Sequence, residues 1–304
     1  MKETPRHLRP PGPRPTRRAV VLAALLSTAA ALPDSGDRPP HAVPSTADVD
    51  GPPPVSALID PAPAAQAISA PQQPPSRADV VKTFSGRPAR YWGLEAPGAL
   101  TRLPQGTQGV AVTVDFCGGP GGSDFDKGLL SVLHERRVPA TLFLNSRWIA
   151  ANPATAWQLA ADPLFELANH GTSHRPLSTT GRAAYGIPGT QNVGEVYDEV
   201  MTNDAGLKQL TGARPRFFRP GTAYLDDVAA QIVGVLGLAP IGFSINADGG
   251  ATFPAATVAR EAAKARPSDI IICHGNHPRG GTAEGIAQAL DTLATRGTPF
   301  IHLP

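Results

Sequence analysis

Cysteine is scarce in this chain, and its scarcity excludes one class of small secreted protein. The 304 residues include only two cysteines, Cys117 and Cys273. Domains that depend on a network of disulfides contain more than two. A single bridge between these two is still compatible with an oxidising environment, and the sequence alone does not show whether it forms.

Excess charge is also nearly absent. The formal net charge is +2 over the whole chain, and much of the excess lies near the start. Proteins that bind nucleic acids carry a stronger or more concentrated positive charge, so we expect no nucleic-acid partner. The glycine-rich segment 118–122 fits neither the dinucleotide-binding nor the phosphate-loop motif. The helical faces leave the oligomeric state unknown.

The apolar run near the start is too short to span a membrane. Residues 19–32, AVVLAALLSTAAAL, follow a group of arginines and number about fourteen, whereas a span of roughly 30 Å needs about twenty. Ala29 and Ala31 form an A-x-A cleavage pattern, so residues 1–31 are predicted to be a signal peptide, with no stable membrane span after its removal. Arg17 and Arg18 suit twin-arginine export as well as ordinary secretion, and both routes stay open.

The next segment has the composition of a linker. Residues 32–78 are rich in proline and alanine and show no apolar periodicity. Such a segment buries too little apolar surface to offset the entropy lost on ordering. We predict a disordered Pro/Ala-rich linker that holds a folded domain, residues 79–304, away from a wall or membrane.

Within that domain, short apolar runs alternate with helical patterns. Strands that are almost continuously apolar and alternate with helices are typical of a parallel sheet covered on its outer face. We therefore predict an α/β fold in which about seven parallel strands form a distorted (β/α) barrel, not an open doubly wound sheet. The predicted strands are 109–116, 140–145, 164–169, 216–220, 241–246, 269–274 and 299–303, and the predicted helices are 128–136, 193–210, 226–236, 257–265 and 283–295.

Polar residues recur where these strands end, which in a β/α barrel is the catalytic face. His170 and His174 are four residues apart, a spacing that lets both imidazoles reach one metal ion. Asp115 ends an apolar strand directly before flexible glycines, as a carboxylate aimed into a site would. The complete set at the strand ends is Asp115, His170, His174, Arg219, Asp248 and His274.

Five segments give these residues a family context. TVDFC, HGTSH, RFFRPGT, INADGG and IIICH resemble, in order and approximate spacing, the five motifs of the NodB-type polysaccharide deacetylases, or carbohydrate esterase family 4. The resemblance runs from about residue 109 to the end of the chain. It implies a hydrolase with a divalent metal ion, zinc in the first place with cobalt as an alternative.

The resemblance also implies roles for the residues at the strand ends. Asp115 corresponds to the general base, and His170 and His174 correspond to the metal ligands. His274 corresponds to the general acid. Arg219 corresponds to the residue that orients the base and keeps it ionised.

Other expected roles rest on looser matches. Asp248 or Asn246 falls in the motif that supports the arginine or its neighbours. The backbone N–H of Thr222 corresponds to the donor that stabilises the oxyanion, and Tyr224 is expected to supply an aromatic surface to the substrate. His277 is an alternative to His274 for the role of general acid.

The chain departs from the family pattern at the metal site. Phe116 stands where the family has its second aspartate, which is normally the third metal ligand. Asp115 is therefore expected both as base and as ligand, and the division between these roles is open. Gly171, Gly221 and Thr222 also replace the usual Ser or Thr, Pro and Tyr. The other candidates for the third ligand are water, Asp124, Asp126, Asp248 and the thiolate of Cys117.

These observations predict a secreted or cell-wall-associated deacetylase that removes N- or O-acetyl groups from an acetylated polysaccharide. Peptidoglycan, chitin oligomers and xylan are the candidate substrates. One alternative is a metal-dependent amidase of a small amide, which would not require export. The other is a non-catalytic glycan-binding or wall-associated protein, which the aromatic residue at the ligand position makes plausible.

Overall fold

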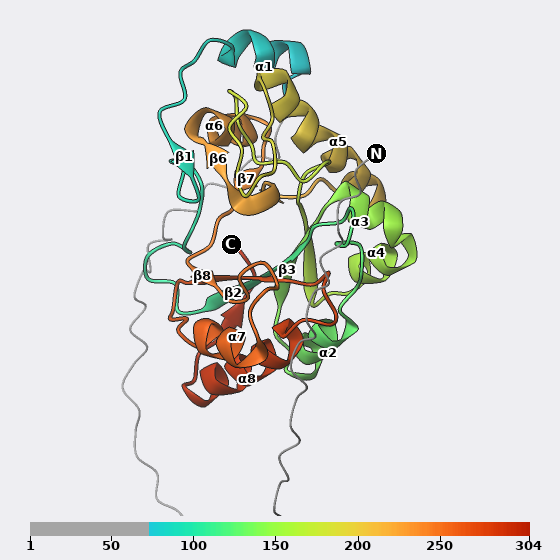
Figure 1. Ribbon diagram of the computed structural model, residues 1–304, viewed down its shortest axis with the longest axis vertical. Coiled ribbons are helices and arrows are strands. Elements are labelled where there is room, and N and C mark those ends of the chain that lie inside the picture. Colours follow the sequence, from blue (N-terminus) through green and yellow to red (C-terminus); the bar gives the residue numbers. More distant parts are fainter. Residues whose placement is uncertain (1–72) are drawn as a thin grey trace, which may run out of the picture. The chain divides into compact units, whose positions relative to one another are not determined.

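The structure describes residues 73–304, in which helices and strands alternate along the chain (Figure 1). It is a computed structural model. The predicted signal peptide and residues 32–72 of the predicted linker lie outside the described residues. The first helix, α1 (Arg77–Phe84), is capped by Ser76 and begins two residues before the predicted boundary of the folded domain. No helix within residues 73–304 is both long enough and apolar enough to cross a membrane.

A curled parallel sheet forms the centre of the domain. Seven strands follow the order β7-β5-β4-β3-β2-β9-β8, and β10 also pairs with β2. The predicted distorted barrel of about seven parallel strands is therefore confirmed. The strands of the sheet are β2 (Val110–Phe116), β3 (Ala140–Leu144), β4 (Phe165–Asn169), β5 (Phe217–Phe218), β7 (Ala239–Pro240), β8 (Ile245–Asn246), β9 (Ile270–His274) and β10 (Phe300–Ile301).

A loop, residues 100–103, links the outer strand β7 to the segment just before β9. Leu100 donates its N–H to the carbonyl of Pro240 and accepts the N–H of Gly242, while the N–H of Leu103 bonds the carbonyl of Ser268. The loop thus connects the edge at β7 with the start of β9. All seven predicted strands contribute to the sheet, but only the end of segment 241–246 is a strand, and β7 was not predicted. Strands of two residues are too short to show a period.

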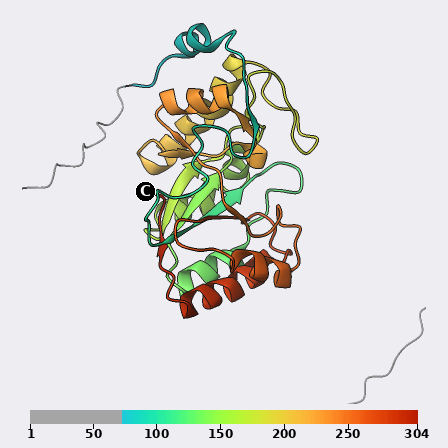
Figure 2. The same ribbon diagram turned by 90° about the vertical axis from the view of Figure 1, so that its left-hand side faces the viewer.

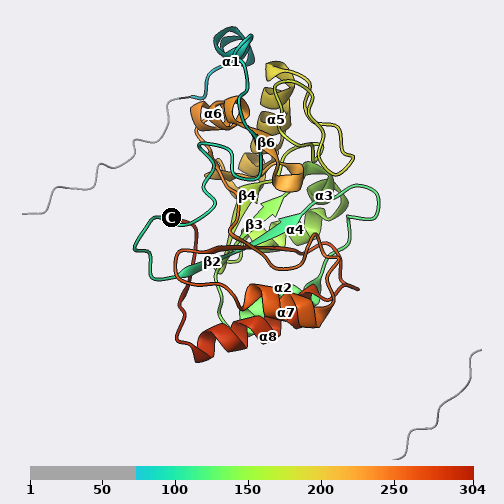
Figure 3. The ribbon, with the colours of Figure 1, turned by 60° about the vertical axis from the view of Figure 1, so that its left-hand side comes forward.

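Helices pack against the curled sheet in two groups. In Figures 2 and 3, α2, α7 and α8 lie on one side of the strands and α5 and α6 on the other. The five predicted helices are confirmed, whereas the short helices α1, α3 and α4 were missed because their sequences show no clear apolar stripe. The remaining helices are α2 (Lys127–Glu135), α3 (Ser146–Ala151), α4 (Pro153–Ala160), α5 (Val193–Thr211), α6 (Asp227–Val235), α7 (Ala255–Ala262) and α8 (Thr282–Thr295).

The central strand β2 is buried along its entire length, as expected for a strand covered on both faces. Val112, Val114 and Phe116 pack with Leu129 and Leu133 of α2 in the core between sheet and helices. The alternate residues face the inside of the curl. Because successive side chains of a strand point in opposite directions, β2 directs Asp115 inward and its neighbour Phe116 toward the helices.

The register of the sheet brings polar residues together at its carboxyl edge. Asp115 of β2 is the direct partner of His274 in β9. Asn169 of β4 is the partner of Phe218 in β5, so His170 and Arg219 follow side by side. A small antiparallel pair, β1 (Trp92–Gly93) with β6 (Leu225–Asp226), lies outside this sheet.

Candidate active site

A cavity of about 640 Å³ opens at the carboxyl edge of the sheet. Its lining includes Asp115, His170, His174, Thr222 and His274. These residues are separated by up to about 160 positions in the sequence and come from different strand ends. The structure therefore brings together most of the residues that the sequence singled out.

A buried ion pair fixes the carboxylate at the bottom of this cavity. Nη1 of Arg219 donates to Oδ1 of Asp115 at 2.7 Å and to Oγ1 of Thr113 at 3.0 Å. The same guanidinium donates to the carbonyl oxygens of Ile241 at 3.2 Å and Gly242 at 2.8 Å. Arg219 is completely buried, and its fixed fork of donors sets the orientation of the carboxylate.

The ion pair also determines the charge state of Asp115. Burial alone would raise the pKa of this carboxyl group, but the positive charge of Arg219, together with His170 and His274, outweighs burial and lowers the pKa below its ordinary value. Asp115 is thus held as a carboxylate although it is buried.

His274 is paired with a different carboxylate. Its Nδ1 lies 2.9 Å from Oδ1 of Asp248, and its backbone N–H donates to Oδ2 at 2.7 Å. Thr282 donates to the same Oδ2 at 3.0 Å. Burial opposes protonation of the imidazole, but Asp248 outweighs it and raises the pKa of His274 well above its ordinary value. Asp248 or Asn246 was expected to support Arg219 or its neighbours, and in the structure the carboxylate of Asp248 orients His274.

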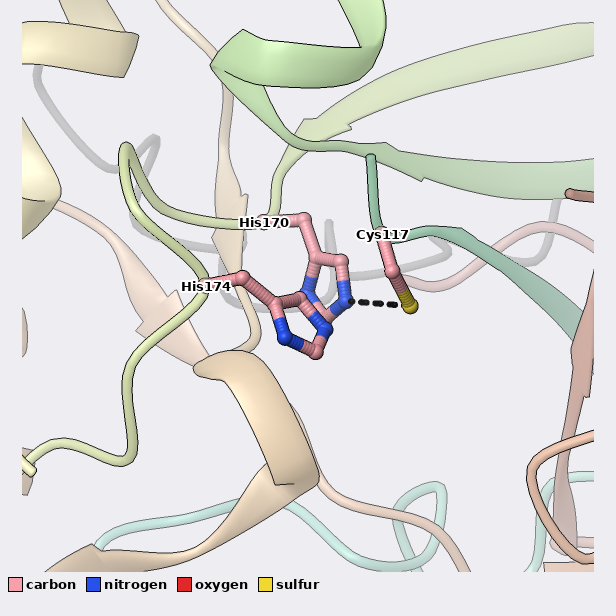
Figure 4. Close-up of side chains that lie close together, drawn as sticks. All are labelled: Cys117, His170 and His174. Atoms are coloured by element: carbon pink, nitrogen blue, oxygen red, sulfur yellow. Dashed lines mark hydrogen bonds between the residues drawn. The ribbon is translucent and has the colours of Figure 1, made fainter. Parts of the chain in front are cut away.

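Three potential metal ligands among the residues of the cavity lining lie close together (Figure 4). Sγ of Cys117 and one ring nitrogen each of His170 and His174 are all within 4.8 Å of one another. The two imidazole rings have centroids 4.8 Å apart and stand almost perpendicular. Two imidazoles and a thiol are ligands that suit a divalent ion such as zinc. Asp115 is not a member of this group, although its Oδ2 lies 3.6 Å from Nε2 of His170, and its expected double role as base and ligand stays a prediction.

The backbone of the histidine loop explains one departure from the family pattern. Gly171 has a φ of +76°, and a Cβ at this position would lie 2.5 Å from Oε1 of Glu199. Glu199 is buried and accepts the N–H of Ser173 with both carboxylate oxygens at 3.0 Å. A serine or threonine at this glycine would therefore displace the carboxylate that holds the loop.

A second glycine is needed where the loop meets the segment after β5. A Cβ on Gly221 would lie 2.3 Å from the backbone of His174, whose own φ is +60°. Thr222 follows with a φ of +70° and lines the cavity. The replacement of the family's Pro and Tyr by Gly221 and Thr222 thus allows the two segments to pack closely.

Several supporting residues escaped prediction from the sequence. Nδ2 of Asn145 donates to the carbonyls of His170 at 2.9 Å and Gly171 at 2.8 Å. Nδ2 of Asn203 donates to Oδ1 of Asn169 at 2.9 Å. Asn145 and Asn169 directly follow or end apolar runs, which is a signal in the sequence, whereas the helical Asn203 carries none.

Phe116 packs in the core, and the two cysteines do not form a disulfide. Phe116 is completely buried, and its ring centroid lies 4.6 Å from that of Trp148. Cys117 and Cys273 are both free. The thiol of Cys273 is directed at the carbonyl of Thr113, 3.7 Å away. The disulfide alternative is therefore not realised in this structure.

The aromatic surface at the cavity comes from a residue that the sequence did not suggest. Tyr185 lines the cavity, is 74% exposed, and has its ring centroid 5.4 Å from that of Tyr224. Tyr224 itself is not part of the lining and also contacts Trp92, at 5.8 Å between centroids. Tyr224 therefore contacts the lining residue Tyr185, and its expected role in substrate binding stays a prediction.

Known proteins share both the sequence pattern and the fold. A profile of the polysaccharide deacetylase family matches residues 103–241. A chitooligosaccharide deacetylase of Bradyrhizobium sp. (strain ANU 289) is 30% identical over 219 residues, which cover 66% of this chain and 90% of that protein. This chain belongs to the polysaccharide deacetylase family. The predicted family, and with it the assignment to the hydrolases, is therefore confirmed.

Solved structures of this family have the same fold. A peptidoglycan N-acetylglucosamine deacetylase superposes with a TM-score of 0.57 at 22% identity, covering 68% of this chain and 91% of that one. A family 4 pseudoenzyme from Bacillus anthracis also has a TM-score of 0.57, at 19% identity, covering 68% of this chain and 67% of that one. The fold is thus shared by relatives described as active and as inactive, so activity has to be argued from the site.

The orientation of Phe116 yields a prediction about stability. Phe116→Asp places a carboxylate against Trp148 and the helices, so we expect it to lower the free energy of unfolding by about 4 kcal/mol. It should add nothing to metal affinity. Denaturant unfolding and metal titration measure the two effects. Phe116→Leu, which keeps the position apolar, is the control. If Phe116→Asp were as stable as Phe116→Leu and bound metal more tightly than the wild type, residue 116 would face the metal site and not the core.

Proposed function

We propose that this chain is a secreted, metal-dependent deacetylase that hydrolyses N- or O-acetyl groups of a cell-wall or extracellular polysaccharide. The observation that carries the proposal is the pair of oppositely tuned groups in one cavity. Arg219 keeps Asp115 ionised, and Asp248 keeps His274 protonated. Asp115 and His274 are direct partners in the sheet. A base and an acid with pKa values driven apart are the requirement for hydrolysis of an amide.

In this proposal, His170 and His174 hold the divalent ion. Such an ion polarises the acetyl carbonyl and lowers the pKa of water toward neutrality. The donor set fits this task because Nδ1 of His170 is bonded to the carbonyl oxygen of Arg219 at 2.8 Å, which leaves Nε2 free as a ligand atom. Zinc is the ion we propose, with cobalt as a substitute.

Asp115 is the general base. Its carboxylate takes the proton of the attacking water as the tetrahedral carbon forms. Arg219 holds the carboxylate in position and in its ionised form. The backbone N–H of Thr222, which also lines the cavity, donates to the developing oxyanion, and such a preorganised donor contributes roughly 3 kcal/mol.

His274 is the general acid. Nδ1 is bonded to Asp248, so Nε2 is the nitrogen that delivers a proton to the leaving amine or alcohol. His277 also lines the cavity, but the carboxylate of Asp248 orients His274. The acid role is therefore assigned to His274.

The proposed substrate is a glycan outside the cell. The Bradyrhizobium relative is named for chitooligosaccharides and one structural neighbour for peptidoglycan N-acetylglucosamine. The exposed ring of Tyr185 at the cavity suits stacking on a sugar ring. Residues 1–31 have the composition of an export signal, which accords with a substrate outside the cell.

The decisive test combines metal content with acetate release. The full chain, wild type beside His170→Ala, is assayed on acetylated chitin oligomers, peptidoglycan and acetylxylan. We expect close to one metal ion per wild-type chain, loss of that ion in the variant, and acetate from at least one substrate. If the protein releases no acetate from any of these substrates after zinc or cobalt is added, the proposal is wrong, and the alternative of a non-catalytic glycan-binding protein takes its place.

The pairing of His274 with Asp248 yields a pH prediction. The acid acts while it is protonated, so kcat/KM falls as the pH rises through the pKa of His274, which Asp248 raises. Asp248→Asn removes the charge and should move this basic limb to lower pH. Thr282→Val, which removes one bond to Asp248 but keeps its charge, is the control. An unchanged basic limb in the asparagine variant would contradict the acid role of His274.

The position of Tyr185 yields a prediction about substrate binding. Tyr185→Ala should raise KM for an oligosaccharide about fivefold, the effect of losing ~1 kcal/mol of aromatic stacking, with kcat little changed. Tyr185→Phe should retain the wild-type value. Trp157→Ala is the matched control, because this exposed aromatic lies on α4 and is not part of the cavity. Equal effects of the two alanine variants would refute a role for Tyr185.

A further inference from the structure

Cys117 lies beside the histidine pair, one residue after the position at which this chain has Phe116 in place of the family's second aspartate. Its Sγ lies 3.7 Å from Nε2 of His170, and the thiol lines the cavity (Figure 4). Nε2 of the same histidine is 3.6 Å from Oδ2 of Asp115. The thiol therefore belongs to a cluster of chemically complementary groups and is accessible from the cavity.

The tautomer of His170 determines what this cluster requires. The carbonyl oxygen of Arg219 only accepts hydrogen bonds, so Nδ1 of His170 must donate to it. In the neutral imidazole, Nε2 then presents a lone pair toward the thiol of Cys117. An imidazole lone pair, a sulfur and a second imidazole from His174 thus converge on one point. A cation is the partner that such a set of electron-pair donors lacks.

The chain holds Cys117 at this point through the packing on both sides of it. Phe116 is fixed in the core, and a Cβ on Gly275 would lie 2.3 Å from its ring. Gly118 has a φ of +69°, and a Cβ there would lie 2.4 Å from the backbone nitrogen of Trp148. The turn is closed by a hydrogen bond from Gly118 to the carbonyl of Gly122 at 3.0 Å. The residue between these anchors has little freedom to turn away.

The acidic residues that were candidates for the third ligand are engaged elsewhere. Asp126 caps α2 by accepting the N–H of Leu129 at 3.0 Å. Asp248 is bonded to His274. The side chain of Asp124 is 57% exposed. None of them belongs to the group of potential ligands found among the described residues.

We propose that the thiolate of Cys117 is the third protein ligand of the metal ion, together with His170 and His174. Metal binding displaces the thiol proton, which leaves to solvent. A ligand set of two imidazoles and a thiolate favours zinc or cobalt over magnesium and manganese, which prefer oxygen ligands. It also leaves Asp115 free to act only as base. The inference rests on the metal dependence proposed above, but not on the identity of the glycan.

Cobalt substitution tests this proposal without an activity assay. Cobalt(II) bound by a thiolate shows an intense near-ultraviolet charge-transfer band that oxygen and nitrogen ligands do not produce. The full-length protein is stripped of metal, loaded with cobalt(II), and compared with Cys117→Ser, Cys117→Asp and Cys273→Ser. Cys273 is the matched control, since it is the other free cysteine and its thiol is directed at the carbonyl of Thr113.

We expect the band in the wild type and in Cys273→Ser, and its loss in both Cys117 variants. Cys117→Ser should also weaken zinc binding by more than about tenfold, since even the loss of an outer-shell partner of a ligand has an effect of that size. Cys117→Asp should recover binding without the band. A cobalt-loaded wild type without the band, or a Cys117→Ser variant that keeps it, would overturn the proposal. Acetate release measured in parallel separates this failure from a failure of the proposed deacetylase activity.

Discussion

The buried ion pair between Asp115 and Arg219 is the interaction on which the rest of the site depends. The guanidinium joins β2 to the segment that follows β7, because it bonds the carboxylate and the carbonyl oxygens of Ile241 and Gly242. The backbone carbonyl oxygen of Arg219 accepts a hydrogen bond from Nδ1 of His170 and so fixes the orientation of that ring. Removing either charge would leave the other buried without a partner, which typically costs several kcal/mol. Arg219 thus orients Asp115 through its side chain and His170 through its backbone.

Charge separation within the cavity follows from two independent pairs. Arg219 lowers the pKa of Asp115, whereas Asp248 raises the pKa of His274, although the two titrating residues are adjacent in the sheet. Burial alone would work against the charged form of each group, so the partner decides the outcome in both cases. The division of labour that we propose between base and acid would in this way be built into the packing around the cavity.

Glycines account for much of the local departure from the family pattern. Gly171 and Gly221 let the histidine loop pass close to Glu199 and to the segment after β5. Gly118 does the same for the turn that follows Cys117. These glycines let the loop with His170 and His174 and the turn after Cys117 approach one another at the edge of the sheet, where we propose that a metal ion binds.

The sequence by itself determined the parallel sheet, the long helices and the residues at the strand ends, because period and strand-end position are local properties of the chain. It did not determine that Asp248 pairs with His274, that Tyr185 replaces Tyr224 at the cavity, or that α1, α3 and α4 exist. Those features depend on contacts between distant segments or on elements too short to show a period. Whether Phe116 or Cys117 faces the histidines was likewise decided only by tertiary structure, since the packing of the helices against β2 selects which side chain turns inward.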